Sequence, residues 1–417
     1  MFLKILFSLV FCIIFFSPAF AQTDDYLYDG IIGAETSNLP KIMDENFLIS
    51  EFTTGLNFPT TMEFVGNDIL VLQKNDGLVR HVLQNGKILE EPVLDAKVSN
   101  YLERGMLGIV ATKDSAVYLY YTESNEDGGE PIANNIYKYK WKNGELIEPE
   151  LIKSLPSYPD AIMHQGGVMT VGNDNTVYAV IGDQDNQDLK HGANILQNQF
   201  APPDNTGVII PIDPEGPYFG IGIRNSFGIT VDPETGYLWQ TENGPDRFDE
   251  INLVEQNFNG GWNAHSGPIS ESKINIYELP NFMGVLKSHI QLFLSNIYAK
   301  FFLSENYVYS DPEFSWEKTI SPTALSFAPN SFGKFQGELF VGDCIGGNIY
   351  KFKLNDNRDG FIFNDESLQD LIFSQGDDLD EILFADGFGC ITDIEFKNDK
   401  MFVVSLAYGK IYEISLN

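Results

Sequence analysis

Residues 163–184 read MHQGGVMTVGNDNTVYAVIGDQ and open the part of the chain that decides both fold and site. Two further blocks follow, GIRNSFGITVDPETGYLW at 222–239 and TENGPDRFDEINLVEQNFNGGW at 241–262. Each block joins a β-like run to a histidine, an Arg-Asn pair or a Gly-Pro-acid cluster. These residue types abstract protons, bind anions and bind hard cations. We therefore expect the three blocks to meet in one site.

Short runs rich in β-branched and aromatic residues recur along the chain, separated by Gly, Asn, Asp and Pro. We predict strands at 69–73, 116–121, 136–141, 176–181, 338–341, 348–354, 400–406 and 410–414. Hairpin signals occur at Asn75-Asp76-Gly77, Asn85-Gly86 and Asn143-Gly144. A long chain of short hairpin strands must avoid open sheet edges, and a ring of radial sheets is one solution. The sequence therefore predicts an all-β propeller in a single domain.

One segment departs from this β pattern. Between residues 280 and 303, apolar side chains recur at helical spacing. We expect an inserted helical segment at about 270–305 that packs on the ring. A lid over the channel mouth and a docking surface for a protein partner at 280–303 are the alternatives.

The N-terminus reads as a secretory signal peptide over residues 1–21, with a retained membrane anchor as the alternative. Lys4 supplies the positive charge, a short apolar run follows, and Ala19-Phe20-Ala21 fits a cleavage site. Residues 22–44 are then an N-terminal extension and 45–417 the propeller. We expect a secreted or extracytoplasmic protein with no integral membrane segment after signal cleavage, because no later segment is apolar over a spanning length.

The chain is strongly acidic, with a formal net charge of -33. Such a field repels nucleic acid and attracts metal cations. Only Cys344 and Cys390 remain once the signal peptide is removed. In an oxidising compartment, one disulfide or two buried free cysteines both fit this count.

Five motifs in register carry a resemblance to a known family. Besides the three blocks above, LERGMLG occupies 102–108, and SPT at 321–323 is followed by GELFVG at 337–342. In this order and spacing, the chain resembles the soluble glucose/sorbosone, or aldose sugar, dehydrogenases that use pyrroloquinoline quinone (PQQ). The resemblance spans roughly residues 54–412. It implies six four-stranded antiparallel blades around a channel, with a small-molecule sugar and an electron acceptor as partners.

The resemblance also implies roles for individual residues. His164 matches the general base of the family, and imidazole is suited to that task because it titrates near neutral pH. Asp183 matches an aspartate that orients this histidine, although Gly-Asp after a strand is also a common turn. Arg224 and Asn225 match a pair that contacts the quinone, and Arg224 suits a developing oxyanion. Glu103, where some relatives have Gln, faces the cofactor or caps a turn.

An oxygen-rich loop follows the Arg-Asn block. Asn243 is expected to contact the cofactor, and Gly244 and Pro245 match the family position where carbonyl groups hold a Ca²⁺ that also binds the cofactor. Asp249 and Glu250 match positions that serve structure or a second Ca²⁺. Backbone carbonyls and carboxylates are ligands that Ca²⁺ accepts readily. We therefore predict a calcium site at Gly244, Pro245, Asp249 and Glu250.

The last part of the chain departs from the family pattern. Relatives place a lysine after the Leu-Phe-Val strand and two arginines in a late F-G-R-x-R-D-V motif. Here Ile345 occupies the first position, and residues 388–394 read FGCITDI. PQQ is a tricarboxylate, and three cations that would bind its carboxylates are missing here. Cys344 and Cys390 lie at or beside these positions. If they face one channel from adjacent strands, their Cα atoms should lie within about 7 Å.

Two functional hypotheses follow. The first is a secreted quinoprotein sugar dehydrogenase that oxidises an aldose at the anomeric carbon, with His164 as general base. The alternative is a catalytically degenerate, Ca²⁺-binding propeller that acts as a carbohydrate-binding or cell-surface interaction module. The joint retention of His164, Asp183, Arg224 and Asn225 favours the enzyme.

Overall fold

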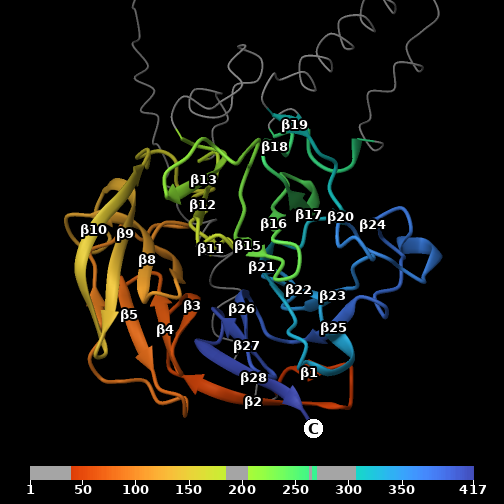
Figure 1. Cartoon of the computed structure of the whole chain (residues 1–417), viewed down its shortest axis with the longest axis horizontal. Helices are drawn as coiled ribbons and strands as arrows, with labels where there is room; N and C mark the ends of the chain where they lie inside the picture. The colour runs from red at the N-terminus through yellow and green to blue at the C-terminus, as the bar shows by residue number, and fades with distance from the viewer. Residues whose placement is uncertain (1–38, 185–204, 263–264, 270–306) are drawn as a thin grey trace, which may run out of the picture.

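The computed structural model describes residues 39–184, 205–262, 265–269 and 307–417. Figure 1 shows these residues as sheets arranged in a ring, with neighbouring sheets packed face to face. The described residues contain no α-helix, only the short 3-10 helices η5 (Gly333–Phe335) and η6 (Glu366–Leu368). The prediction of an all-β propeller is confirmed.

The described strands form six sheets. The first holds β3 (Pro59–Val65), β4 (Asp68–Gln73), β5 (Leu78–Val82) and β6 (Leu94–Asp95). The second holds β7 (Met106–Ala111), β8 (Ala116–Ser124), β9 (Pro131–Lys142) and β10 (Glu145–Leu155). The third holds β11 (Met169–Val171), β12 (Val177–Ile181), β13 (Val208–Asp213) and β14 (Gly220–Ile221), extended by β18 (Phe258–Asn259) and β19 (Val308–Tyr309).

The remaining sheets follow in chain order around the ring. The fourth holds β15 (Gly228–Val231), β16 (Leu238–Glu242), β17 (Arg247–Val254) and β20 (Phe314–Lys318), extended by β24 (Ile372–Phe373). The fifth holds β21 (Pro322–Phe327), β22 (Leu339–Asp343), β23 (Ile349–Phe352) and β25 (Leu383–Asp386), extended by β1 (Lys41–Ile42). The sixth holds β26 (Ile391–Lys397), β27 (Lys400–Ser405), β28 (Lys410–Leu416) and β2 (Phe47–Thr54).

Every sheet thus has the predicted core of four antiparallel strands, and three sheets carry additional short strands. The added strands β18, β19 and β24 pair in parallel with their neighbours. Such parallel pairs are not part of the four-stranded antiparallel blades that the resemblance implies. The eight strands predicted from the sequence all exist, with ends shifted by a few residues at most, apart from β9, which begins earlier.

The two ends of the described chain close the ring. Strand β2 pairs with β28 from Phe47↔Leu416 to Thr54↔Lys410, so an N-terminal strand completes the sheet of the last three strands. The innermost strands β3, β7, β11, β15, β21 and β26 contact one another in a closed cycle. Strand β1 pairs with β25 of the neighbouring sheet, so the described end of the segment 22–44 packs on the ring.

Side chains packed between neighbouring sheets form the core. Strand β4 is buried along nearly its whole length because a sheet covers each face, which explains the apolar run at 69–72. Outer strand β10 is mostly exposed and carries charges that suit an edge. The two-residue turn that enters it, Asn143-Gly144, has φ of 54° and 85°, as the predicted hairpin requires.

Two predictions lie outside the described residues: the signal peptide at 1–21 and the helical segment at about 270–305. Most of the predicted N-terminal extension, residues 22–38, lies outside them as well. Within the described ranges, no helix is long and apolar enough to cross a membrane.

Candidate active site

A cavity of about 420 Å³ lies in the channel between the sheets. Eight of the ten residues predicted for the site line it: Glu103, His164, Arg224, Asn225, Asn243, Gly244, Pro245 and Asp249. The structure therefore brings the three sequence blocks together, as expected. Asp183 does not line the cavity but contacts His164, which does, and Glu250 does not line it either.

The backbone around Gly182 explains how the blocks meet. This glycine follows β12, and a Cβ atom there would lie 2.4 Å from the carbonyl oxygen of His164 and 2.6 Å from that of Arg224. The next amide, that of Asp183, donates to the carbonyl of Arg224 at 2.8 Å. A side chain at residue 182 would push the loops apart, so Gly182 permits the close approach of all three segments.

His164 and Asp183 form a buried pair. Nδ1 of His164 lies 2.6 Å from Oδ1 of Asp183, and the two residues are 6% and 5% exposed. The other carboxylate oxygen, Oδ2, accepts a hydrogen bond from Nε1 of Trp262 at 2.6 Å. Asp183 is thus held from two sides, and it fixes the orientation of the imidazole. No described residue forms a hydrogen bond with Nε2 of His164, the nitrogen left for a ligand.

Arg224 is positioned by its neighbours rather than by an ion pair. Its Nη1 donates to the carbonyl of Asn243 at 2.8 Å, and its guanidinium lies 5.5 Å from the centre of the Trp262 ring. Trp262 therefore supports both Asp183 and Arg224, a role that its sequence block alone does not reveal. Within the described residues, no carboxylate lies within ion-pair distance of Arg224.

Asn225 and Glu103 contact each other across the cavity wall. Nδ2 of Asn225 donates to the Glu103 carboxylate at 3.2 and 3.3 Å, and the amide of Gln165 donates to it at 3.2 Å. Burial raises the pKa of Glu103, although nearby His164 lowers it in part. Oδ1 of Asn225 is buried without a hydrogen-bond partner among the described residues. The Asn225 side chain thus offers an oxygen that can accept a hydrogen bond from a ligand.

The predicted calcium ligands divide into two kinds. Gly244 and Pro245 both line the cavity, and no described residue donates a hydrogen bond to their carbonyl oxygens. The carboxylate of Asp249 instead accepts three backbone hydrogen bonds, from Gly244 at 2.8 Å, Ile320 at 2.6 Å and Ser321 at 2.7 Å. Asp249 therefore clamps the loop to the strand connection before β21.

Glu250 is likewise occupied by protein groups. Its oxygens accept from the amide of Gly267 at 2.6 Å and from Nδ2 of Asn252 at 3.0 Å. Burial raises its pKa to about 7. Among the described residues, no three His, Cys, Asp or Glu side chains are grouped so as to hold a metal ion. An all-carboxylate cage at Asp249 and Glu250 is thus not present in this part of the chain.

Glu242 is a buried acid that the sequence patterns did not identify. One of its oxygens accepts from the amide of Asn225 at 2.6 Å, and the other has no partner among the described residues. Burial raises its pKa to about 8, against the opposing effect of the Asn225 hydrogen bond. Glu242 thus holds the backbone of the Arg-Asn pair and does not itself line the cavity.

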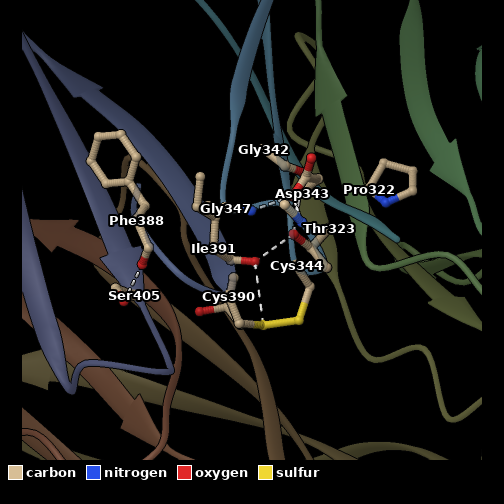
Figure 2. The surroundings of a disulfide bond; sticks show 12 residues. Pro322, Thr323, Gly342, Asp343, Cys344, Gly347, Phe388, Cys390, Ile391 and Ser405 are labelled. Atoms are coloured by element: carbon tan, nitrogen blue, oxygen red, sulfur yellow. Dashed lines mark hydrogen bonds between the residues drawn. A yellow bond between two sulfur atoms is a disulfide. The ribbon is translucent and has the colours of Figure 1, made fainter. Parts of the chain in front are cut away.

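The wall formed by the last two sheets is uncharged, as the departures from the family pattern predict. Cys344, Ile345, Cys390 and Thr392 all line the cavity, and Ile345 is 63% exposed. Figure 2 shows that Cys344, after β22, and Cys390, before β26, form a disulfide. Their Cα atoms lie 3.7 Å apart, within the expected 7 Å. The bridge joins the fifth sheet to the sixth at the cavity.

Other basic residues do not fill the missing positions. Arg358, the one cation in the stretch between Lys353 and Lys397, pairs with the buried Asp232 at 2.6 and 2.8 Å. It does not line the cavity. Lys74, however, does line it, and the sequence patterns missed this residue because it precedes a turn outside the recognised motifs.

A second cavity, of about 310 Å³, adjoins the first along the channel. Five residues line both cavities: Thr61, Val168, Phe227, Thr323 and Thr392. The second cavity contains the carboxyls of Glu63, Asp393 and Glu395. Burial raises the pKa of Glu63 and of Asp393 to about 7, and burial with its acidic neighbours raises that of Glu395 well above its ordinary value. This acidic end of the channel opposes the binding of anions there.

The chain is similar in sequence to two sugar dehydrogenases. An aldose sugar dehydrogenase of Escherichia coli strain K12 is 22% identical over 330 residues, which cover 74% of this chain and 82% of the relative. Quinoprotein glucose dehydrogenase B of Acinetobacter calcoaceticus is 27% identical over 271 residues, which cover 54% of each protein. These relatives are named as sugar dehydrogenases, which are oxidoreductases acting on CH-OH groups.

Solved structures show the same fold. The PQQ-bound aldose sugar dehydrogenase of Streptomyces coelicolor superposes with a TM-score of 0.61 at 18% identity, over 91% of this chain and 100% of that one. The apo form of the soluble Escherichia coli enzyme gives a TM-score of 0.63 at 18% identity, over 89% and 100%. A family model described as glucose / sorbosone dehydrogenase matches residues 56–281, more than half of the chain. The protein therefore belongs to the glucose/sorbosone dehydrogenase family.

Proposed function

We propose that this protein is a quinoprotein sugar dehydrogenase that oxidises an aldose at its anomeric carbon, with His164 as the general base. The observation that carries the proposal is the buried His164–Asp183 pair at the wall of the cavity. In this proposal the six sheets are the blades of the propeller, and the active site lies at one end of its channel.

The His164 ring is oriented for proton transfer. With Asp183 accepting from Nδ1–H, the neutral imidazole presents Nε2 as its acceptor. Nε2 takes the proton of the anomeric hydroxyl, and Asp183 stabilises the imidazolium that forms. The substrate loses a hydride in the same oxidation and becomes a lactone. Arg224, at the same wall, stabilises negative charge on oxygen as it develops.

The cavity fits PQQ in size and in the groups it offers. About 420 Å³ lies within the range of small-molecule sites, which is roughly 300 to 1,000 Å³. Arg224 and the unpartnered Oδ1 of Asn225 would hold polar groups of the cofactor. When bound, PQQ would accept the two electrons that leave the substrate. An external electron acceptor would then take these two electrons from the cofactor.

Calcium is proposed at the carbonyl oxygens of Gly244 and Pro245. Their lack of hydrogen-bond donors among the described residues and their place in the cavity wall support this, because Ca²⁺ takes neutral carbonyl ligands readily. Asp249 and Glu250 shape the loop in this proposal and are not ligands. The disulfide supports the proposed extracytoplasmic location, because such bonds persist in oxidising compartments.

Reconstitution of the purified protein tests the function. With Ca²⁺ and PQQ added, the wild-type protein should oxidise at least one aldose in a dye-linked assay. His164→Ala should lose at least about a hundredfold in kcat while binding PQQ and keeping its circular dichroism spectrum. Wild-type protein that binds PQQ and turns over no aldose would overturn the proposed activity. Equal activity in His164→Ala would remove His164 from the reaction.

A further inference from the structure

The charges on the cavity wall are distributed unevenly. Among the described residues that line the cavity, the lysine and arginine side chains are Lys74 and Arg224. Lys74 directly follows β4 of the first sheet, and Arg224 follows β14 of the third. The fifth and sixth sheets contribute the disulfide, Ile345, Thr392 and Leu406 instead. Figure 2 shows the disulfide between these two sheets. An anionic ligand therefore finds its cations on the side of the first and third sheets.

Lys74 is a buried cation without a counter-ion among the described residues. The residue is 5% exposed, and its Nζ donates to Oδ1 of Asn75 at 3.0 Å and to the carbonyl of Asn100 at 3.1 Å. Both acceptors are neutral, and an ammonium group has a third N–H to donate. Burying an unpaired charge is costly, so an anion at this site would be stabilised.

The charge on Glu103 does not neutralise that of Lys74. Burial lowers the pKa of Lys74 to about 8, and the charge on Glu103 opposes this only in part. The carboxylate of Glu103 is held instead by the amide of Gln165 and the side chain of Asn225. Lys74 thus keeps its proton near neutral pH while one N–H lacks an acceptor in the described part of the chain.

We propose that Lys74 binds a carboxylate of the bound ligand and substitutes for the cations missing from the last two sheets. The ligand class is a planar aromatic carboxylate, and PQQ is the member that the proposed function requires, on which this inference rests. Its anionic groups would face Lys74 and Arg224, and its apolar face would lie against the disulfide and Ile345. In this binding mode the first and third sheets bind the carboxylates of the ligand. It would differ from a mode in which cations of the last two sheets bind them.

Binding of PQQ and of its trimethyl ester, measured by fluorescence quenching in the presence of Ca²⁺, tests this inference. The ester has the same ring system without charged carboxylates. Lys74→Gln should weaken binding of PQQ at least tenfold and leave binding of the ester within about twofold. Lys74→Arg should retain PQQ binding within a few-fold, because the positive charge is kept. Lys97→Gln, an exposed lysine paired with Asp95 and Asp127, is the matched control.

The pH dependence gives a second readout. Binding of PQQ by the wild type should weaken as pH rises above about 8, where free Lys74 loses its proton. Lys74→Arg should bind PQQ equally well across that range. Unchanged PQQ affinity in Lys74→Gln, or equal losses for acid and ester, would overturn the inference and leave the proposed function intact. Wild-type protein that binds neither compound would overturn both.

Discussion

His164 and Asp183, 19 residues apart in the sequence, meet through Nδ1 and Oδ1 at 2.6 Å in a buried position. The pair depends on Gly182, whose missing side chain lets the two segments approach. It also depends on Trp262, which holds the second oxygen of Asp183. The base and its partner are therefore fixed before a substrate binds, which removes an entropic cost from the reaction.

Asp183→Asn should lower kcat about 10²- to 10⁴-fold with little change in the fold. An asparagine can offer its NH₂ group to Nδ1, which favours the tautomer with a proton on Nε2 and removes the acceptor that the reaction needs. Steady-state kinetics on the reconstituted enzyme measures the effect. Asp95→Asn, at an exposed surface ion pair, should leave kcat unchanged. A kcat within twofold of wild type in Asp183→Asn would show that this carboxylate does not orient the base.

Asp249→Asn should destabilise the protein by about 2–3 kcal/mol, because one of three backbone amides then faces an NH₂ group and the charge is lost. Urea unfolding in a chelator measures this. Asp246→Asn, an exposed change in the same loop, should have an effect below about 0.5 kcal/mol. If Asp249→Asn is destabilising only when Ca²⁺ is added, Asp249 is a metal ligand and not a loop clamp.

The sequence could predict those features that local patterns carry. Strands such as β4 and β8 follow from β-branched and aromatic runs, and the turn at Asn143-Gly144 follows from its residue types. The motifs placed His164, Asn225 and Gly244 in one cavity correctly. The proximity of Cys344 and Cys390 also followed from the motif positions that they occupy.

Contacts between distant segments could not be predicted. The oxygen-rich loop around Asp249 predicts a calcium ligand but does not reveal the backbone hydrogen bonds that its carboxylate accepts. Two of its actual partners, the amides of Ile320 and Ser321, lie about 70 residues further along the chain. Lys74 was missed for a related reason: nothing near it in sequence shows that its side chain is buried beside a cavity. Whether a carboxylate finds hydrogen-bond partners, and whether a side chain is buried, depends on contacts that form only in the assembled ring.

Removing the disulfide should lower the free energy of unfolding by about 2–4 kcal/mol. The bond closes a loop with a sequence separation of 46 residues, and opening it raises the chain entropy of the unfolded state. The double variant Cys344→Ala/Cys390→Ala should unfold at lower urea concentration than oxidised wild type. Wild-type protein in a reductant should match the double variant. Identical urea midpoints for oxidised wild type and the double variant would show that the bond adds no stability.

The carboxyls of the second cavity should make the protein less stable as pH rises from about 4.5 to above 7. Their pKa values are higher in the folded chain than the ordinary value of 4.5 for Glu, chiefly through burial. The folded state therefore binds protons more tightly than the unfolded state. The resulting stabilisation is complete below pH 4.5 for the glutamates and below pH 3.8 for Asp393, and it is lost as pH rises through the raised pKa values, about 7 for Glu63 and Asp393.

Glu395→Gln separates this effect from other titrations, because glutamine resembles the protonated acid in shape and charge. The thermal midpoint of the variant should exceed that of wild type at pH 8, because Glu395 ionises freely in the unfolded chain, whereas burial and the charges of Asp393 and Glu63 oppose its ionisation in the folded chain. The difference should shrink toward zero at pH 4.5, where Glu395 carries its proton in the folded chain. Glu145→Gln, on an exposed outer strand, should follow wild type at every pH. A variant midpoint that stays below wild type at pH 8 would mean that the charge of Glu395 is compensated within the channel.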